Sequence, residues 1–275
     1  MSIVAPRSET SVDPAFSHED GLDLVVSWQH PVTRATTPVA LLSQQPRGYM
    51  FRYLRRASDV DGFRPFLGFA DLHATYWSEE LFPLFAQRAM DDPRRRDYRP
   101  YLAHLGLAEG ASPWEQIVRS GGDSAGDTIK VSPMPQLIDG SWYCVSPITG
   151  IKYLTTKSVA MRGERHGPYS QEQLDAVLAT LCIGSQVRLV HESGNQYSTA
   201  ATLAATTTHM PFGYLPDWLA HMIYPFIEDD ASAAIVDQIG RYFGKWYVRL
   251  LIRLDGRVGA SLESLLGPDW ETFAD

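Results

Sequence analysis

The stretch that decides the fold of the second half of the chain is Gly184-Ser185-Gln186-Val187-Arg188-Leu189-Val190, followed by His191-Glu192-Ser193-Gly194-Asn195-Gln196-Tyr197. The first part alternates apolar and polar residues, which is typical of a half-buried strand, and the second is a polar loop rich in turn residues. An apolar run over 200–205 predicts another short strand. Gly213-Tyr214-Leu215-Pro216 then leads into 217–223, which has the pattern of a helix. This order predicts part of a small β-barrel with a polar, aromatic pocket.

Length and composition predict a folded protein with packed cores. The chain has 275 residues, 44% of them hydrophobic, which suffices for one large or two ordinary domains. It has no apolar run of the roughly 18 residues needed to cross a bilayer, and residues 1–21 lack the basic start and apolar middle of a signal peptide. We therefore expect a soluble, cytoplasmic protein without a membrane partner. Cys144 and Cys182 have no Cys or His at ligand spacing, so we expect no metal site, disulfide or cofactor.

The formal net charge is −8, but it is unevenly distributed. Residues 1–21 carry one basic and four acidic side chains, and residues 255–275 carry one basic and five acidic ones, so these two ends account for −7. A near-neutral body argues against avid coating of duplex DNA, because phosphate neutralisation supplies most of that affinity. It permits a pocket that holds one strand end through stacking and a few hydrogen bonds.

The first half of the chain has strand patterns followed by helix patterns. Residues 22–28, 38–42 and 48–54 predict an antiparallel β-meander, and the last of these alternates its aromatic residues on one face. A helix start is predicted at 78–82, where Ser is followed by acidic residues. Another helix is predicted at 112–118, with Ser as N-cap, Pro at the first position and Glu at the third.

The strand, loop, strand and helix of residues 184–223 resemble the HIRAN domain, and we place this domain at 157–254. The resemblance implies a compact OB-like barrel with one or two helices that grips the free 3′ end of single-stranded DNA. In this family an Arg followed by an aromatic residue or His lies across the pocket, and Arg165 and His166 match that pair. The resemblance implies that Arg165 contacts a phosphate and that His166 stacks on a base or binds the terminal phosphodiester.

Asn195 and Tyr197 match the Asn-Pro-Tyr-Asp loop of the same family, where they would bond to and stack on the terminal nucleotide. Gln196 replaces the usual Pro and Ser198 the usual Asp, which removes an acceptor for a 3′-hydroxyl. The structural alternatives are that Asn195 only caps a turn, that Tyr197 plugs the barrel and that the Arg-His pair is a solvated strand end.

A second group of candidate nucleic-acid contacts is Tyr242, Lys245 and Trp246. In 241–246 cations alternate with aromatic residues, a pattern that suits single-stranded nucleic acid. The alternative is a β-turn with exposed ends.

The first half resembles the small N-terminal subdomain of HipA-type kinases. The resemblance rests on Gly48-Tyr49-Met50-Phe51-Arg52-Tyr53, on 64–67 and 80–85, and on Gly122-Asp123-Ser124-Ala125-Gly126-Asp127-Thr128-Ile129. In that family the ATP-binding and catalytic residues follow in later segments, which this chain lacks. The resemblance implies that residues 22–135 are a docking or regulatory module for a protein partner such as a HipA-type kinase.

Catalytic motifs are weak throughout. The glycine-rich run 120–126 lacks the Lys-Ser/Thr end of a phosphate-binding loop, and the eight histidines never stand four residues apart on a predicted helix. Gly122-Asp123-Ser124-Ala125-Gly126 has the Gly-x-Ser-x-Gly spacing, but this run does not lead from a strand into a helix as a nucleophile turn requires. We therefore expect a protein that is not an enzyme, with no catalytic residues and no metal ligands.

These patterns predict an α+β protein of two modules: an antiparallel β-meander with helices and a small OB-like or HIRAN β-barrel. Residues 1–21 are predicted as a disordered leader, 136–156 as a connector and 255–275 as an acidic tail. The expected function is recognition of single-stranded DNA or DNA ends in bacterial defence or repair, with a protein partner docked on the first module. The alternatives are an antitoxin-like regulator that binds a HipA-type kinase in trans without nucleic acid, and an enzyme whose nucleophile the motifs do not reveal.

Overall fold

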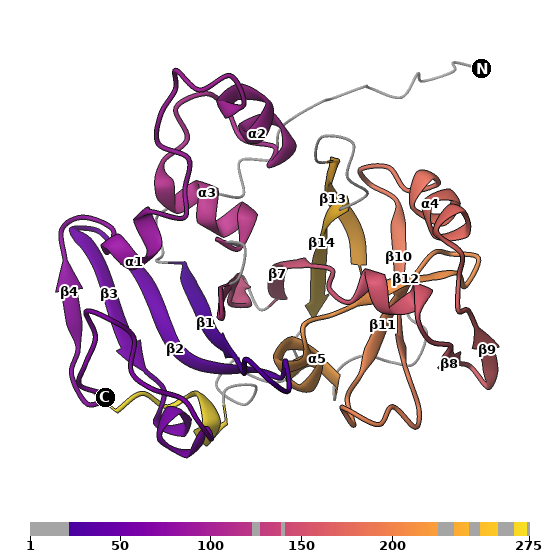
Figure 1. Cartoon of the computed structure of the whole chain (residues 1–275), viewed down its shortest axis with the longest axis horizontal. Coiled ribbons are helices and arrows are strands. Elements are labelled where there is room, and N and C mark those ends of the chain that lie inside the picture. Colours follow the sequence, from indigo (N-terminus) through magenta and orange to yellow (C-terminus); the bar gives the residue numbers. More distant parts are fainter. Residues whose placement is uncertain are drawn as a thin grey trace, which may run out of the picture.

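The computed structural model of the chain describes residues 22–122, 127–138, 141–224, 234–241, 248–257 and 267–273. They form an α+β structure with mostly antiparallel sheets, one of them curled into a half-barrel, and few helices (Figure 1). Within these ranges, no helix has the length and apolar character required to span a bilayer. The predicted leader lies outside the described residues.

The N-terminal half is built on a five-stranded antiparallel sheet in the order β4-β3-β2-β1-β5. Its strands are β1 (Asp23–Gln29), β2 (Thr36–Gln45), β3 (Gly48–Tyr53), β4 (Tyr76–Ser78) and β5 (Ile129–Pro133). The alternation predicted for the third strand places Phe51 and Tyr53 in the core, where neither side chain is exposed.

Short helices lie beside this sheet: the 3₁₀ helix η1 (Arg55–Asp59) and the α-helices α1 (Pro83–Ala86), α2 (Tyr98–His104) and α3 (Pro113–Ser120). The predicted start of α3 is confirmed as a capping box. The Ser112 hydroxyl accepts a hydrogen bond from Glu115 N at 3.2 Å, and Ser112 N donates to Glu115 Oε2 at 2.7 Å. Trp114 and Ile117 are then buried in the same core as Phe51.

The helix start predicted at Ser78 is wrong. Ser78 is the last residue of β4 and pairs with Tyr49 of β3, and the helix begins only at Pro83 and ends at Ala86. Pairing at the edge of the sheet therefore outweighs the local preference of Ser and Glu for a helix N-terminus.

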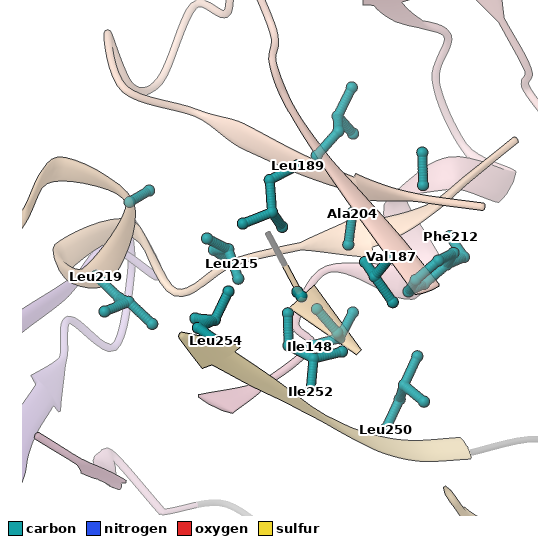
Figure 2. Packing of buried hydrophobic residues seen from close by; sticks show 14 of the residues in the cluster. Ile148, Val187, Leu189, Ala204, Phe212, Leu215, Leu219, Leu250, Ile252 and Leu254 are labelled. Atoms are coloured by element: carbon teal, nitrogen blue, oxygen red, sulfur yellow. The ribbon is translucent and has the colours of Figure 1, made fainter. Parts of the chain in front are cut away.

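The C-terminal half is built on a seven-stranded sheet in the order β12-β11-β10-β13-β14-β7-β6. Its strands are β6 (Gln136–Ile138), β7 (Ser141–Pro147), β10 (Gln186–His191), β11 (Thr202–Ala205), β12 (Pro211–Tyr214), β13 (Ala234–Arg241) and β14 (Val248–Arg257). The sheet curls around a continuous apolar core, into which α5 (Asp217–Ile223) projects Leu219 (Figure 2). The strands and the helix expected within 184–223 are thus present.

Residues 136–156, predicted as a connector, lie within this half. β7 pairs with β14 over its whole length, and the 3₁₀ helix η2 (Ile151–Thr155) follows. The next elements are the two-stranded hairpin β8 (Val159–Met161) and β9 (Glu164–His166), and the helix α4 (Gln171–Ala179).

Gly213 in β12 allows the backbone after β7 to approach closely. A Cβ at this position would lie 2.3 Å from Ile148 Cγ2 and 2.9 Å from the Thr149 carbonyl oxygen. Only a glycine leaves room for the bridge between Thr149 and Tyr214, which joins the η2 segment to the edge of the half-barrel.

The two halves share buried contacts. Val25, Leu41 and Leu54 belong to the same apolar cluster as the C-terminal core. Arg119 of α3 forms an ion pair with Asp237 of β13 at 2.5 Å, and both side chains are more than four-fifths buried. The two halves of the chain are therefore joined by apolar packing and by a buried ion pair.

Candidate nucleic-acid interface

The loop between β10 and β11 is organised by Asn195. Its Oδ1 accepts hydrogen bonds from Tyr197 N at 2.8 Å and Ser198 N at 3.1 Å, and its Nδ2 donates to Glu192 Oε2 at 2.6 Å. The orientation of the amide follows from these partners, since only the nitrogen can donate to a carboxylate. Asn195 thus uses both ends of its side chain within the loop, as the turn-capping alternative expects.

The buried Glu192 carboxylate holds three segments together. Besides Asn195 it accepts hydrogen bonds from Ala160 N of β8 at 3.2 Å and from the Tyr214 hydroxyl of β12 at 2.9 Å. Burial, together with this neighbouring carboxylate, raises the pKa of the Tyr214 hydroxyl above its usual value, so the phenol remains protonated and donates. The loop is therefore anchored to both β8 and β12.

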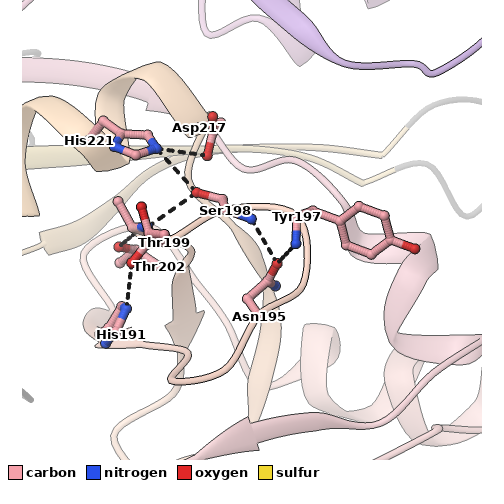
Figure 3. Close-up of polar contacts among 9 residues, drawn as sticks. His191, Asn195, Tyr197, Ser198, Thr199, Thr202, Asp217 and His221 are labelled. Carbon is pink, nitrogen blue, oxygen red and sulfur yellow. Dashed lines mark hydrogen bonds and ion pairs between the residues drawn. The ribbon is translucent and has the colours of Figure 1, made fainter.

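Tyr197 is exposed on this anchored loop. Its side chain is 84% exposed, and its ring points away from Asn195 and Ser198 (Figure 3). The alternative in which Tyr197 plugs the barrel is therefore wrong. The loop backbone, held by its hydrogen bonds to Asn195, exposes the ring to solvent.

Lys157 lies between two exposed aromatic rings. Its Nζ is 4.6 Å from the centroid of the Tyr197 ring and 5.5 Å from that of Tyr153, which is 44% exposed. The Nζ of Lys152 is 5.7 Å from the centroid of the Tyr153 ring. We call Lys152, Tyr153, Lys157 and Tyr197 the aromatic–lysine patch. Its alternation of rings and ammonium groups matches cation–π geometry.

The surroundings of the patch are basic in an otherwise acidic chain. Residues 150–170 carry four basic side chains and one acidic one, a net charge of +3 against −8 for the whole chain. Two of only four lysines in the sequence are in the patch. This local excess of positive charge favours an anionic ligand.

Arg165 and His166 lie on β9, one strand away from the loop. Arg165 pairs with Ala160 of β8, whose backbone N–H donates to Glu192, so β8 stands between β9 and the loop. Arg165 is exposed and His166 is half-buried. The structure therefore brings the four residues predicted at 165, 166, 195 and 197 onto neighbouring segments, with Arg165 and Tyr197 exposed.

The tip of the β8–β9 hairpin adds another basic contact. Arg162 Nη1 lies 3.2 Å from His209 Nε2 at the tip of the β11–β12 connection. A guanidinium only donates, so the His209 nitrogen is the acceptor in this contact. Tyr242, Lys245 and Trp246, the second predicted group, lie outside the described residues.

Ser198, His221 and Asp217 come together but do not form a catalytic triad. The Ser198 hydroxyl and the Asp217 carboxylate both face His221 Nε2, at 3.4 and 3.8 Å (Figure 3). A triad needs the carboxylate on one ring nitrogen and the hydroxyl on the other. Across the part of the chain that the structure describes, no group of His, Cys, Asp or Glu has the arrangement of a metal site.

Sequence reasoning missed Lys152, Tyr153 and Lys157, because the first two fell in the predicted connector. The available signal was the run Ile151-Lys152-Tyr153-Leu154-Thr155-Thr156-Lys157, in which two of the few lysines flank an aromatic residue. The missing information was tertiary, since only the folded chain places Lys157 against Tyr197.

Comparison with family models, with curated proteins and with solved structures finds no match to this chain.

Proposed function

We propose that this protein binds single-stranded nucleic acid, without catalysis, at the aromatic–lysine patch. The observation that carries the proposal is the position of Lys157 between the exposed rings of Tyr153 and Tyr197. Unpaired bases stack on exposed aromatic rings regardless of sequence, and lysines beside the rings neutralise the phosphates that accompany them.

The chemistry of the patch limits the strength and salt dependence of binding. Each stacked base contributes about 1–3 kcal/mol, so two rings support modest affinity. Each phosphate neutralised on a single strand contributes a slope of about −0.7 in log affinity against log salt. With Lys152 and Lys157 as the cations of the patch, we expect a much shallower dependence than that of a duplex-coating protein.

The ligand that we propose is single-stranded DNA, held at its 3′ end by an OB-like or HIRAN-type barrel. In support, strand, loop, strand and helix follow in the expected order, and the Asn195 loop faces the β8–β9 hairpin that carries Arg165 and His166. Asn195 acts as a positioning residue in this proposal, because its amide orients the backbone of Tyr197. Arg165 supplies a phosphate contact and His166 a stacking or hydrogen-bonding group.

Fluorescence anisotropy with a labelled oligothymidylate tests the binding proposal. Tyr197→Ala is expected to weaken binding by about 1–3 kcal/mol, and Tyr153→Ala by a similar amount. Trp77→Ala is the matched control, since this aromatic residue is 54% exposed on β4 of the other half. The absence of binding at low salt, or an equal loss in the control, would contradict the proposal.

The end preference needs a second comparison. The same oligonucleotide with a blocked 3′ terminus is expected to bind more weakly than one with a blocked 5′ terminus. Equal binding of the 3′-blocked and 5′-blocked oligonucleotides would contradict recognition of the 3′ end and leave only binding of single strands.

The N-terminal half is proposed to dock a protein partner, as its resemblance to the HipA subdomain implies. Its sheet and helices form a core of their own beside the half-barrel. Purification with the product of a neighbouring gene that encodes a HipA-type kinase would support this half of the proposal. A neighbourhood without any kinase gene would count against that partner.

A further inference from the structure

Residues 267–273, the C-terminal segment, lie against the N-terminal half, first as the 3₁₀ helix η4 (Pro268–Trp270) and then as a short extended stretch around Thr272 (Figure 1). Arg55 N donates a hydrogen bond to the Glu271 carbonyl at 2.9 Å, and Phe273 N donates to the Tyr53 carbonyl at 3.2 Å. Leu54 and Thr272 form an antiparallel bridge between these two bonds. The end of β3 and the start of η1 thus accept an added strand from more than 200 residues away.

Side chains fix the register of this segment. Thr272 is only 2% exposed, and its carbonyl accepts a hydrogen bond from Arg55 Nε at 3.1 Å. The Phe273 ring lies 4.4 Å from the His73 ring. Thr272 and Phe273 therefore both meet formed surfaces, while the preceding Glu271 is exposed.

Charges on the two sides are complementary. Arg55 pairs with Glu271 at 2.7 Å, and Arg56 lies 4.0 Å from Asp269. These pairs are largely solvent-exposed, so they add little stability and instead favour an acidic segment over a basic one.

The segment does not fill the surface on which it lies. A hollow of about 420 Å³ opens beside Asp269, lined also by Thr37, Arg56 and Val60. Gly267, Pro268 and Asp269 are exposed. The contact is therefore concentrated at the last described residues.

Main-chain pairing with a strand end, a buried side chain and complementary charge are features by which domains recognise extended peptides. We propose that the groove formed by the end of β3, η1 and His73 is a peptide-docking site, occupied in cis by Asp269-Trp270-Glu271-Thr272-Phe273. In trans it binds an extended segment of a partner protein that carries an acidic residue, then Thr, then an aromatic residue. This proposal specifies the docking half of the proposed function and is independent of the nucleic-acid half.

Occupation in cis makes the site switchable. A partner segment must displace the chain's own, so its apparent affinity equals the affinity for the free groove multiplied by the fraction of time that the groove is free. Weakening the cis contact is therefore expected to tighten binding in trans.

The experiment uses the full chain and a fluorescent peptide with the sequence of residues 267–275. Thr272→Asp places a charge at a buried position of the cis segment, and this variant is expected to bind the wild-type peptide at least tenfold more tightly than the wild-type chain does. Adding Arg55→Ala should abolish that gain, and a peptide carrying Thr272→Asp should not bind. Glu271→Arg, at an exposed position, is the milder variant and should show a smaller gain if Thr272→Asp impairs folding.

Two further measurements on the same samples make the outcome decisive. Oligothymidylate binding should be unchanged in these variants, so a protein that binds the oligonucleotide but never the peptide overturns this proposal alone. Size-exclusion chromatography tests whether the groove binds the C-terminal segment of a second copy of the chain. A wild-type dimer that dissociates in the Thr272→Asp variant would show such an exchange and would overturn the partner-protein proposal.

Discussion

Glu192 is the residue on which the candidate site depends most. Its carboxylate accepts hydrogen bonds from Ala160, Asn195 and Tyr214, which belong to three different segments. A carboxylate suits this position because it offers only acceptors to three converging donors. The anchoring role of Glu192 could not be predicted from the sequence, because two of its three hydrogen-bond donors are distant in the chain.

Glu192→Gln is expected to lower the free energy of unfolding by about 1–3 kcal/mol, because the new amide brings donors of its own to a place where donors already converge. Urea denaturation followed by tryptophan fluorescence measures the change. Glu164→Gln is the matched control, since Glu164 is exposed on β9. A loss in Glu192→Gln no larger than that of the control would show that the three hydrogen bonds do not anchor the loop.

The candidate site was only partly predictable at the level of residues. The local pattern around Asn195 and Tyr197 sufficed to predict a polar turn with an aromatic residue. Lys157 was missed because its contact with Tyr197 spans 40 positions in the chain. Periodicity and turn chemistry report neighbours along the sequence, not neighbours in space.

At the scale of elements, local signals succeeded where they agreed with the tertiary structure. The Ser112 cap of α3 is an example, because its helix also buries Trp114 and Ile117. The strand β12 was missed, since Pro211 and Gly213 are both poor strand residues. Gly213 is nevertheless required there by the close approach of Ile148 and Thr149.

Ser112→Ala is expected to lower the stability of the protein by about 1 kcal/mol, because it leaves Glu115 N without its side-chain acceptor. Ser112→Thr keeps the hydroxyl, so its stability should fall much less than that of Ser112→Ala. Thermal unfolding of the two variants makes the comparison. Equal melting temperatures for both variants would mean that the α3 cap contributes nothing measurable.

At the scale of the whole molecule, the two halves are coupled by packing and by their termini. Trp270 of the C-terminal segment contacts Trp218 of α5 with ring centroids 5.6 Å apart, while Thr272 is bridged to Leu54. The same segment therefore touches both halves. Sequence patterns predicted the α+β class, but they treated the C-terminal segment as an acidic tail because its partners lie in the first half of the chain.

Stability should fall in alkaline solution. Burial raises the pKa of the Cys144 thiol from 9.0 to about 12 and that of the Tyr143 hydroxyl from 10.0 to about 12. The folded state then holds protons that the unfolded state releases, so stability is intact below about pH 9 and is lost as the pH rises toward 12. Between about pH 8 and about pH 10.5 the thiol alone is expected to cost roughly 2 kcal/mol.

Urea denaturation at these two pH values measures this loss. Cys144→Ala should lose roughly 2 kcal/mol less than the wild type over this interval. Cys182→Ala is the matched control, since Cys182 is exposed, and it should behave as the wild type does. Identical pH dependence in all three proteins would exclude the buried thiol as a cause.

Photo-crosslinking tests most directly where nucleic acid binds. An oligonucleotide that contains 5-iododeoxyuridine is irradiated with the protein, and the adducts are located by mass spectrometry. We expect adducts on Tyr153 or Tyr197 that disappear in Tyr197→Ala combined with Tyr153→Ala. Efficient crosslinking confined to residues 22–122 would contradict this expectation, because the ligand would then lie on the other half of the molecule.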